Sequence, residues 1–177
     1  MSFTIKKFPI NSLKDETLVE KVKDYISHNS CCVNYPNCNH PPIQSNPYLF
    51  FDERFKGVYN ETMNAIKEIY KEEIENSETK HIKITSWGFL QKKDEETLKH
   101  KWHHHLEGDN KYQYSFIMYL TPTNHGTLFI NSFDVKQLLI PETGFIFFWD
   151  SNYVHAPDIG KFNEERIVIA GDVAFTQ

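Results

Sequence analysis

The feature that most constrains the fold is a change in hydrophobic periodicity near residue 76. Before it, apolar residues recur at about every third or fourth position, as on one face of an α-helix. After it, short apolar runs are separated by turn residues such as Pro122, Gly126 and Pro141, which is typical of short β-strands. Because the helices precede the strands, the order disfavours a parallel βαβ sheet. We expect a mainly β sandwich, barrel or jelly roll with helices packed on its outside.

Two amphipathic helices are expected in residues 1–80. The first is predicted over 12–29, with Ser12 as its N-cap, and the second over 55–74. The stretch between them, 29–47, is rich in Asn, Pro and Cys and has no periodicity, so it should form an extended loop. Residues 1–80 would then be a helical support for the strands.

The remaining residues, 81–177, should form about seven short strands. They are predicted over 81–89, 99–106, 112–120, 126–130, 137–140, 145–149 and 166–175. A chain of 177 residues is long enough to bury about 70% of its unfolded surface in one core. We therefore expect one domain over 1–177, with the strand core in 81–177.

Charge and hydropathy exclude several classes of partner. The net charge is −5 and no block of Lys or Arg stands out, which argues against nucleic acid as a partner. The N-terminal residues lack the apolar segment of a secretion signal, and no stretch approaches the ~18 apolar residues of a membrane span. We expect a cytoplasmic protein without membrane contact. A homodimer is compatible with the sequence, which leaves the oligomeric state open.

Three cysteines, Cys31, Cys32 and Cys38, cluster in the predicted loop, close to His40. An odd number argues against a disulfide framework, so reduced thiols are expected. Thiolates and imidazole are ligands that zinc favours, but adjacent cysteines fit the usual spacing poorly. An irregular loop that carries cysteines is the main interpretation, and a structural zinc site is the alternative.

The run His103-His104-His105 is the strongest candidate for a functional site. In an extended strand alternate side chains share a face, so His103 and His105 should point to the same side. A third ligand must come from elsewhere, and His155, which follows the apolar run 145–149, is the natural candidate. Imidazole binds Fe, Zn, Cu and Ni, so three histidines alone do not select the metal.

Arg166 lies eleven positions beyond His155, at the start of an apolar strand. A guanidinium inside a β-barrel is costly to bury unless it meets a carboxylate, and its planar fork suits one. That carboxylate could belong to a small-molecule cosubstrate. The alternative is a surface arginine paired with Glu164 or Glu165.

Taken in order, these pieces resemble the Fe(II)/2-oxoglutarate dioxygenase superfamily, in particular its prolyl-hydroxylase-like members and its short phage- or bacterium-encoded members. The resemblance covers about residues 82–175. The matching segments are 100–105, 115–120, 126–129, 141–144, 147–155 and 166–169. The resemblance implies a double-stranded β-helix, a cupin-like jelly roll, flanked by the two helices.

The resemblance also implies a ligand set. His103, His105 and His155 would bind Fe(II). The family usually has a carboxylate at the position of His105, which puts the triad in question. A His-x-Glu pattern ends at Glu107, so this residue could replace His103 or His105. The three-histidine set is preferred because Trp102 precedes His103 as in the viral members.

Two further residues would bind the cosubstrate. Arg166, and Tyr119 at the end of the strand before Leu120, are expected to bind the distal carboxylate of 2-oxoglutarate. Core packing is the alternative for Tyr119. Asp150 and Asn152 could orient the ring of His155, although a turn would favour the same residue types.

The implied activity is hydroxylation coupled to decarboxylation of 2-oxoglutarate to succinate and CO₂, with ascorbate as an additional reductant. The primary substrate is not identified: a protein side chain ranks ahead of a small metabolite or a nucleobase. One alternative is a three-histidine, cupin-like metalloenzyme that does not use 2-oxoglutarate. The other is a non-catalytic jelly-roll module for binding or structure, in which the histidines are incidental.

Overall fold

Eight strands and three α-helices make up the part of the chain that the computed structural model describes, which is residues 3–30, 44–76, 78–92, 102–105, 112–158 and 164–177. The strands are β1 (Lys6–Pro9), β2 (His81–Gln91), β3 (Tyr114–Tyr119), β4 (Thr127–Ile130), β5 (Lys136–Leu139), β6 (Phe145–Asp150), β7 (Val154–Pro157) and β8 (Arg166–Thr176). The helices are α1 (Leu18–Asn29), α2 (Lys56–Ile69) and α3 (Lys71–Asn76), with 3-10 turns η1 (Asn11–Lys14), η2 (Leu49–Phe51) and η3 (Glu53–Phe55).

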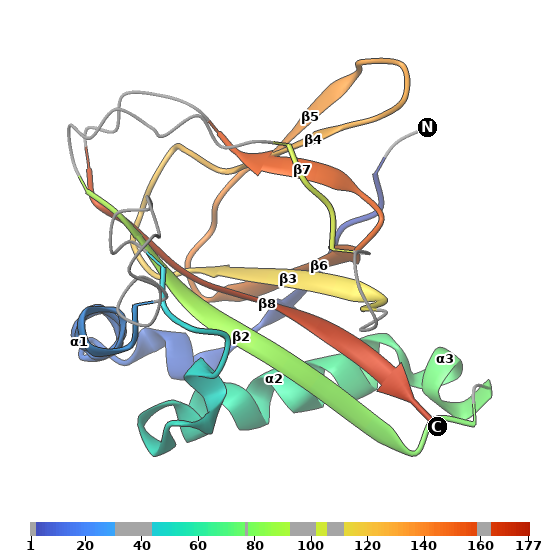
Figure 1. Ribbon diagram of the computed structural model, residues 1–177, viewed down its shortest axis with the longest axis horizontal. Coiled ribbons are helices and arrows are strands. Elements are labelled where there is room, and N and C mark those ends of the chain that lie inside the picture. The colour runs from blue at the N-terminus through green and yellow to red at the C-terminus, as the bar shows by residue number, and fades with distance from the viewer. Residues whose placement is uncertain (1–2, 31–43, 77, 93–101, 106–111, 159–163) are drawn as a thin grey trace.

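The strands form two antiparallel sheets. The larger sheet has the order β1-β6-β3-β8-β2, and the smaller has the order β5-β4-β7. In Figure 1 the three α-helices lie below the larger sheet, and the smaller sheet lies above it. This arrangement confirms the predicted fold class, a mainly β jelly roll with helices on the outside of one sheet.

Two of the strands are absent from the sequence prediction. β1 and β7 have four residues each and both contain a proline, which weakens a strand prediction. β1 pairs with β6, so residues 1–80 contribute a strand as well as helices. β7 pairs with β4 and carries His155.

Both predicted helices are present, but their ends differ from the prediction. α1 begins at Leu18, and Ser12 is not its N-cap: Ser12 lies in η1, where its hydroxyl donates to Glu61 Oε1 at 2.6 Å. The second helix is interrupted at Tyr70, whose backbone leaves the helical region with φ −112° and ψ 23°. The buried Tyr70 ring stacks on Tyr114 at 3.8 Å between centroids.

Several sequence-based expectations lie wholly or partly outside the described residues. Cys31, Cys32 and Cys38 do so, and the loop and zinc interpretations stay predictions. Of the strand expected over 99–106, the structure describes only 102–105. The one-domain division also stays a prediction. Over the described ranges, no helix is long and apolar enough to cross a membrane.

Hydrophobic cores lie on both faces of the larger sheet. Along β3, Phe116 and Met118 pack into the core shared with the helices, whereas Ile117 and Tyr119 pack into the core between the two sheets. β6 alternates in the same way, as expected for strands whose successive side chains point to opposite faces. The helical layer therefore supports the sheet from behind, and the inner core surrounds the space between the sheets.

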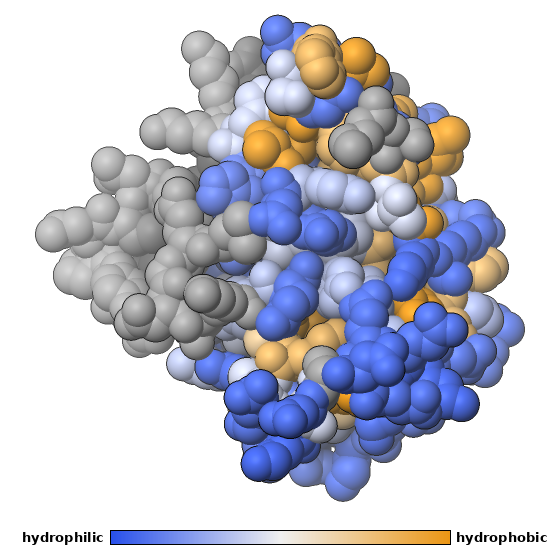
Figure 2. All heavy atoms as spheres, turned by 90° about the vertical axis from the view of Figure 1, so that its right-hand side faces the viewer, coloured by the Kyte–Doolittle hydropathy of each residue, from blue (hydrophilic) through white to orange (hydrophobic). Residues whose placement is uncertain are grey.

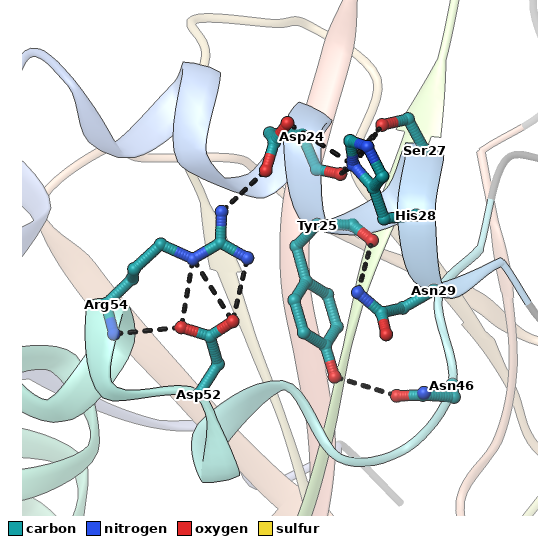
Figure 3. Close-up of polar contacts among 8 residues, drawn as sticks. All are labelled: Asp24, Tyr25, Ser27, His28, Asn29, Asn46, Asp52 and Arg54. Atoms are coloured by element: carbon teal, nitrogen blue, oxygen red, sulfur yellow. Dashed lines mark hydrogen bonds and ion pairs between the residues drawn. The ribbon is translucent and has the colours of Figure 1, made fainter.

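Polar contacts tie α1 to the segment that leads into α2 (Figure 3). Arg54 Nη1 donates to Asp24 Oδ2 at 2.6 Å, and Arg54 Nη2 donates to Asp52 Oδ2 at 2.7 Å. The Tyr25 hydroxyl donates to Asn46 Oδ1 at 2.8 Å. Exposed ion pairs contribute little to stability, so these contacts serve mainly to orient the helical layer.

The β4–β5 hairpin exposes apolar side chains. Phe133 is 79% exposed and Ile140 is 73% exposed. Figure 2 shows hydrophobic residues gathered at the top of this face, where the hairpin lies, and hydrophilic residues at the helical end below. The two ends of the molecule thus differ in polarity.

Gly88 allows α1 to approach β2 closely. A Cβ atom at this position would lie 2.9 Å from Val22 Cγ1 and 3.1 Å from Ile26 Cγ1. Gly88→Ala should therefore lower the free energy of unfolding by about 1–3 kcal/mol, the usual cost of overpacking a core. Urea unfolding monitored by circular dichroism measures this change.

The same substitution made in a Val22→Ala variant supplies the control. Val22→Ala removes the methyl group that the new Cβ would meet, so Gly88→Ala should cost less in that background, as expected for residues in contact. Equal costs in the two backgrounds would contradict the close approach of α1 to β2.

Candidate metal centre

Backbone pairing brings the two histidine-bearing segments together. His155 N donates to His103 O at 2.9 Å, and His103 N donates to His155 O at 3.1 Å. His105 N donates to Ser151 O at 3.1 Å. The segment 102–105 therefore lies beside β7 as an extension of the smaller sheet, although its pairing is an isolated antiparallel bridge and not a full strand.

The side chains of His103, His105 and His155 converge on one point, as the alternation along 103–105 predicts. One ligand nitrogen from each ring lies within 4.8 Å of the other two. The ring centroids are 4.5 Å apart for His103 and His155, and 5.1 Å apart for each pair that includes His105. Three imidazole nitrogens this close together are a donor set that suits a divalent transition metal.

Hydrogen bonds fix the tautomer of two of these rings. His155 Nδ1 lies 2.8 Å from the Tyr153 carbonyl oxygen. Because a carbonyl only accepts, Nδ1 carries the proton and Nε2 carries the lone pair. His105 Nδ1 lies 2.7 Å and 2.8 Å from the two carboxylate oxygens of Asp172, so in the neutral form of this ring Nε2 carries the lone pair.

His105 Nε2 fits a metal ligand for a further reason. It is buried, and it has no hydrogen-bond partner within the described part of the chain. A buried acceptor without a partner is costly unless a ligand completes it.

Burial and the neighbouring His103 lower the pKa of His155 to about 3, so this ring is neutral at physiological pH, the form that binds metals. The donor set therefore fits a metal ion.

Arg166 is buried at the start of β8, with 2% of its surface exposed. Its Nε donates to the His125 carbonyl oxygen at 3.0 Å. Over the described residues no carboxylate oxygen lies within 4.0 Å of its guanidinium, and Glu165 pairs with Lys23 instead. The alternative of a surface arginine paired with Glu164 or Glu165 is therefore wrong. Burial lowers the pKa of Arg166, partly offset by Tyr119.

A cavity of about 360 Å³ joins Arg166 to the three histidines. This is within the size range of small-molecule sites. Its wall is largely apolar and includes Trp87, Phe89, Ile117, Trp149, Pro157 and Val168. The cavity therefore combines a potential metal site, a guanidinium with no carboxylate within 4.0 Å among the described residues, and walls that exclude water.

Tyr119 lies close to this cavity but behind its wall. The side chain is fully buried, and its hydroxyl lies 2.9 Å from Thr127 Oγ1. The Arg166 Cζ atom is 5.4 Å from the Tyr119 ring centroid. Among the described residues, the cavity wall includes Thr127 but not Tyr119. Contact between Tyr119 and a cosubstrate stays a prediction, and Thr127 is a cavity hydroxyl that sequence reasoning missed.

Sequence reasoning also missed a buried polar network behind His105. Asp172 is 4% exposed, and its Oδ1 accepts from Ser115 Oγ at 2.7 Å. The hydroxyls of Ser115 and Ser151 are 3.1 Å apart. The only sequence signal for this network was an acidic residue inside the apolar strand 166–176.

Two expected supporting residues have a different role. Asp150 Oδ1 accepts from the backbone nitrogen of Asn152 at 2.8 Å and from its side chain at 2.7 Å. These contacts stabilise the turn before β7, whereas the ring of His155 is oriented by the Tyr153 carbonyl. The expectation that Asp150 or Asn152 orients His155 is wrong. Glu107, the alternative ligand, lies outside the described residues.

No family model and no curated protein matches the sequence. Solved structures do match it. A Pseudomonas putida prolyl-4-hydroxylase is 10% identical, with a TM-score of 0.65 over 99% of this chain and 95% of that chain. A viral collagen prolyl hydroxylase from Paramecium Bursaria Chlorella virus-1, solved as a 2-oxoglutarate complex, is 12% identical, with a TM-score of 0.59 over 98% and 96%.

A third match is an oxidoreductase of the 2OG-Fe(II) oxygenase family from Burkholderia pseudomallei. It is 11% identical, with a TM-score of 0.62 over 96% of this chain and 84% of that chain. At these identities the likeness concerns the fold. The chain therefore shares the double-stranded β-helix fold of prolyl hydroxylases and 2OG-Fe(II) oxygenase family proteins, as the sequence resemblance predicted.

Proposed function

We propose that the protein is an Fe(II)- and 2-oxoglutarate-dependent oxygenase with a three-histidine metal site. The observation that carries this proposal is the placement of His103, His105 and His155 in the same cavity as the buried Arg166, which has no carboxylate within 4.0 Å in the part of the chain that the structure describes. The fold neighbours support it, because one of them, the viral collagen prolyl hydroxylase, is solved in complex with 2-oxoglutarate.

Each residue has a defined task in this proposal. The three histidines hold the metal from one side and leave its other positions open to small molecules. Arg166 offers a planar set of donors to the distal carboxylate of the cosubstrate, with Thr127 and Tyr119 nearby. The apolar walls keep water out. When bound, Fe(II) and 2-oxoglutarate supply the oxidative decarboxylation that yields succinate and CO₂.

Two alternatives remain to be separated by experiment. The three-histidine ligand set favours a cupin-like metalloenzyme that does not use 2-oxoglutarate. Arg166 favours the enzyme that uses 2-oxoglutarate, because a buried guanidinium with no carboxylate within 4.0 Å among the described residues suits the distal carboxylate of this cosubstrate. The buried His105 Nε2, which has no hydrogen-bond partner within the described ranges, argues against a non-catalytic module.

The proposed primary substrate is a protein side chain, followed by a small metabolite. The prolyl hydroxylases among the fold neighbours support this order. A homodimer and a requirement for ascorbate stay predictions.

The first test concerns metal binding. Mn(II) should raise the thermal stability of the wild-type protein, since a ligand that binds only the folded state at about 100 times its dissociation constant stabilises it by about 2.7 kcal/mol. His155→Ala should remove this response, as measured by differential scanning calorimetry.

An exposed histidine provides the matched control. His28 lies on α1, and its side chain is 72% exposed, so His28→Ala should respond to Mn(II) like the wild type. A wild-type protein whose stability is unchanged by Mn(II) and by Fe(II) would refute the metal site and favour the non-catalytic module.

The second test concerns the cosubstrate. Arg166→Met should raise the KM for 2-oxoglutarate about 30-fold or more in a succinate-release assay with Fe(II) and ascorbate, because loss of one partner from a buried charge pair costs about 2–5 kcal/mol. The stabilisation by Mn(II) should persist, since Arg166 is not a metal ligand.

The control for this test is Arg54→Met, which removes an arginine from the helical layer and should leave the KM unchanged. An unchanged KM in Arg166→Met would instead favour the metalloenzyme that does not use 2-oxoglutarate.

A further inference from the structure

Three histidines supply no negative charge to a divalent ion, but a carboxylate lies directly behind one of them. Asp172 is the one buried carboxylate in the described part of the chain. Its two oxygens lie 2.7 Å and 2.8 Å from His105 Nδ1. The nitrogen on the other side of this ring, Nε2, is buried and has no hydrogen-bond partner among the described residues.

We propose that Asp172 is the positioning residue of the metal centre: it holds His105 with Nε2 towards His103 and His155, and it supplies through the ring the negative charge that the three-histidine set lacks. This inference rests on the proposed metal site. It extends that site by one residue that contacts neither the metal nor a small molecule.

The position of Asp172 is set by the sheet and not by a flexible loop. In β8 it is the register partner of Ser115 in β3 on one side and of Thr85 in β2 on the other. Ser115 Oγ donates to Asp172 Oδ1 at 2.7 Å, which holds the carboxylate in place. A side chain anchored between two neighbouring strands can orient a ligand accurately.

The ring of His105 is held on two sides. Its edge meets Asp172, and its face stacks on Trp87 with 5.9 Å between centroids and 16° between planes. Rotation of the ring by half a turn about its Cβ–Cγ bond would exchange Nδ1 with Cδ2 and Nε2 with Cε1, so that carbon atoms would face both the carboxylate and the site. The hydrogen bond from Nδ1 to Asp172 opposes that rotation, because a charge-assisted bond is stronger than a neutral one.

The other oriented histidine provides a comparison within the same site. His155 Nδ1 donates to a neutral carbonyl oxygen, that of Tyr153, whereas His105 Nδ1 donates to a carboxylate. A carboxylate partner raises the basicity of the opposite nitrogen and so strengthens its bond to a metal. His105 occupies the position at which the superfamily that the sequence resembles usually has a carboxylate ligand, and Asp172 places a carboxylate one imidazole further from the ion.

The test measures the affinity for Mn(II) alone by isothermal titration calorimetry. Asp172→Asn keeps the shape of the side chain but removes its charge, and it should weaken binding about 10–100-fold, the usual cost of losing such a partner. The control is Asp150→Asn, which removes one negative charge from a turn near the site without touching a histidine ring. Its affinity should match that of the wild type.

A second pair of variants separates positioning from a merely structural role. His105→Asp replaces the ring by a carboxylate, which leaves Asp172 with nothing to orient and with a like charge beside it. In that background Asp172→Asn should leave the affinity for Mn(II) unchanged or increase it, whereas structural damage would weaken binding in both backgrounds.

The outcomes are distinguishable. A wild-type protein that does not bind Mn(II) refutes the proposed metal site itself. Wild-type binding that Asp172→Asn leaves intact refutes only the role of Asp172, as does an equal loss in both backgrounds. If Asp172→Asn alone does not fold, the His105→Asp background decides: affinity preserved in the double variant supports the proposal, and affinity lowered about 10-fold or more overturns it.

Discussion

The candidate site depends on one short stretch of backbone pairing, in which His103 and His155 exchange hydrogen bonds of 2.9 Å and 3.1 Å. About fifty residues of chain separate these two histidines, and no local preference would bring their rings together. Opposed residues of an antiparallel pair lie close enough for their side chains to meet. The pairing of β7 with the segment 102–105 therefore converts two distant stretches of sequence into one donor set. The smaller sheet holds β7 through β4, so the metal site inherits its geometry from that sheet.

Around these three histidines, charged side chains of opposite sign lie close together. Burial lowers the pKa of His155 to about 3 and so keeps its ring neutral, and Arg166 contributes a buried positive charge. Asp172 lies behind the histidines with the opposite sign. A small dianion that binds a metal would neutralise the positive charges of Arg166 and of a metal ion better than water would. Isolated charges are costly beside a wall of aromatic side chains. The distribution of charge and the fold neighbours thus support the same cosubstrate by independent arguments.

Periodicity predicted a mainly β fold with helices outside it, whereas the double-stranded β-helix and the joining of His155 to the other two histidines were implied by the family resemblance. Strand alternation placed His103 and His105 on one side, and the apolar strand start placed Arg166 inside. What sequence reasoning missed had no periodic signal. β7 has four residues and contains a proline, and Asp172 is a single acidic residue whose partner lies 67 positions away. For Asp150 and Asn152 the sequence left a turn and a contact with His155 as alternatives, because both favour the same residue types, and the hydrogen bonds support the turn. Only the sheet register could show that Asp172 faces His105.

The alternation of side chains along β3 makes the core and the cavity depend on the same strand register. Phe116 and Met118 belong to the helical core, whereas Ile117 and Tyr119 belong to the core around the cavity. A slip of one residue in the pairing of β3 would exchange the two sets. It would turn Ser115 away from Asp172 and would point Phe116 and Met118 towards the space between the two sheets. A chain with this register error would therefore lose both the core shared with the helices and the cavity. The error leaves no form in which the cavity is correct and that core is not.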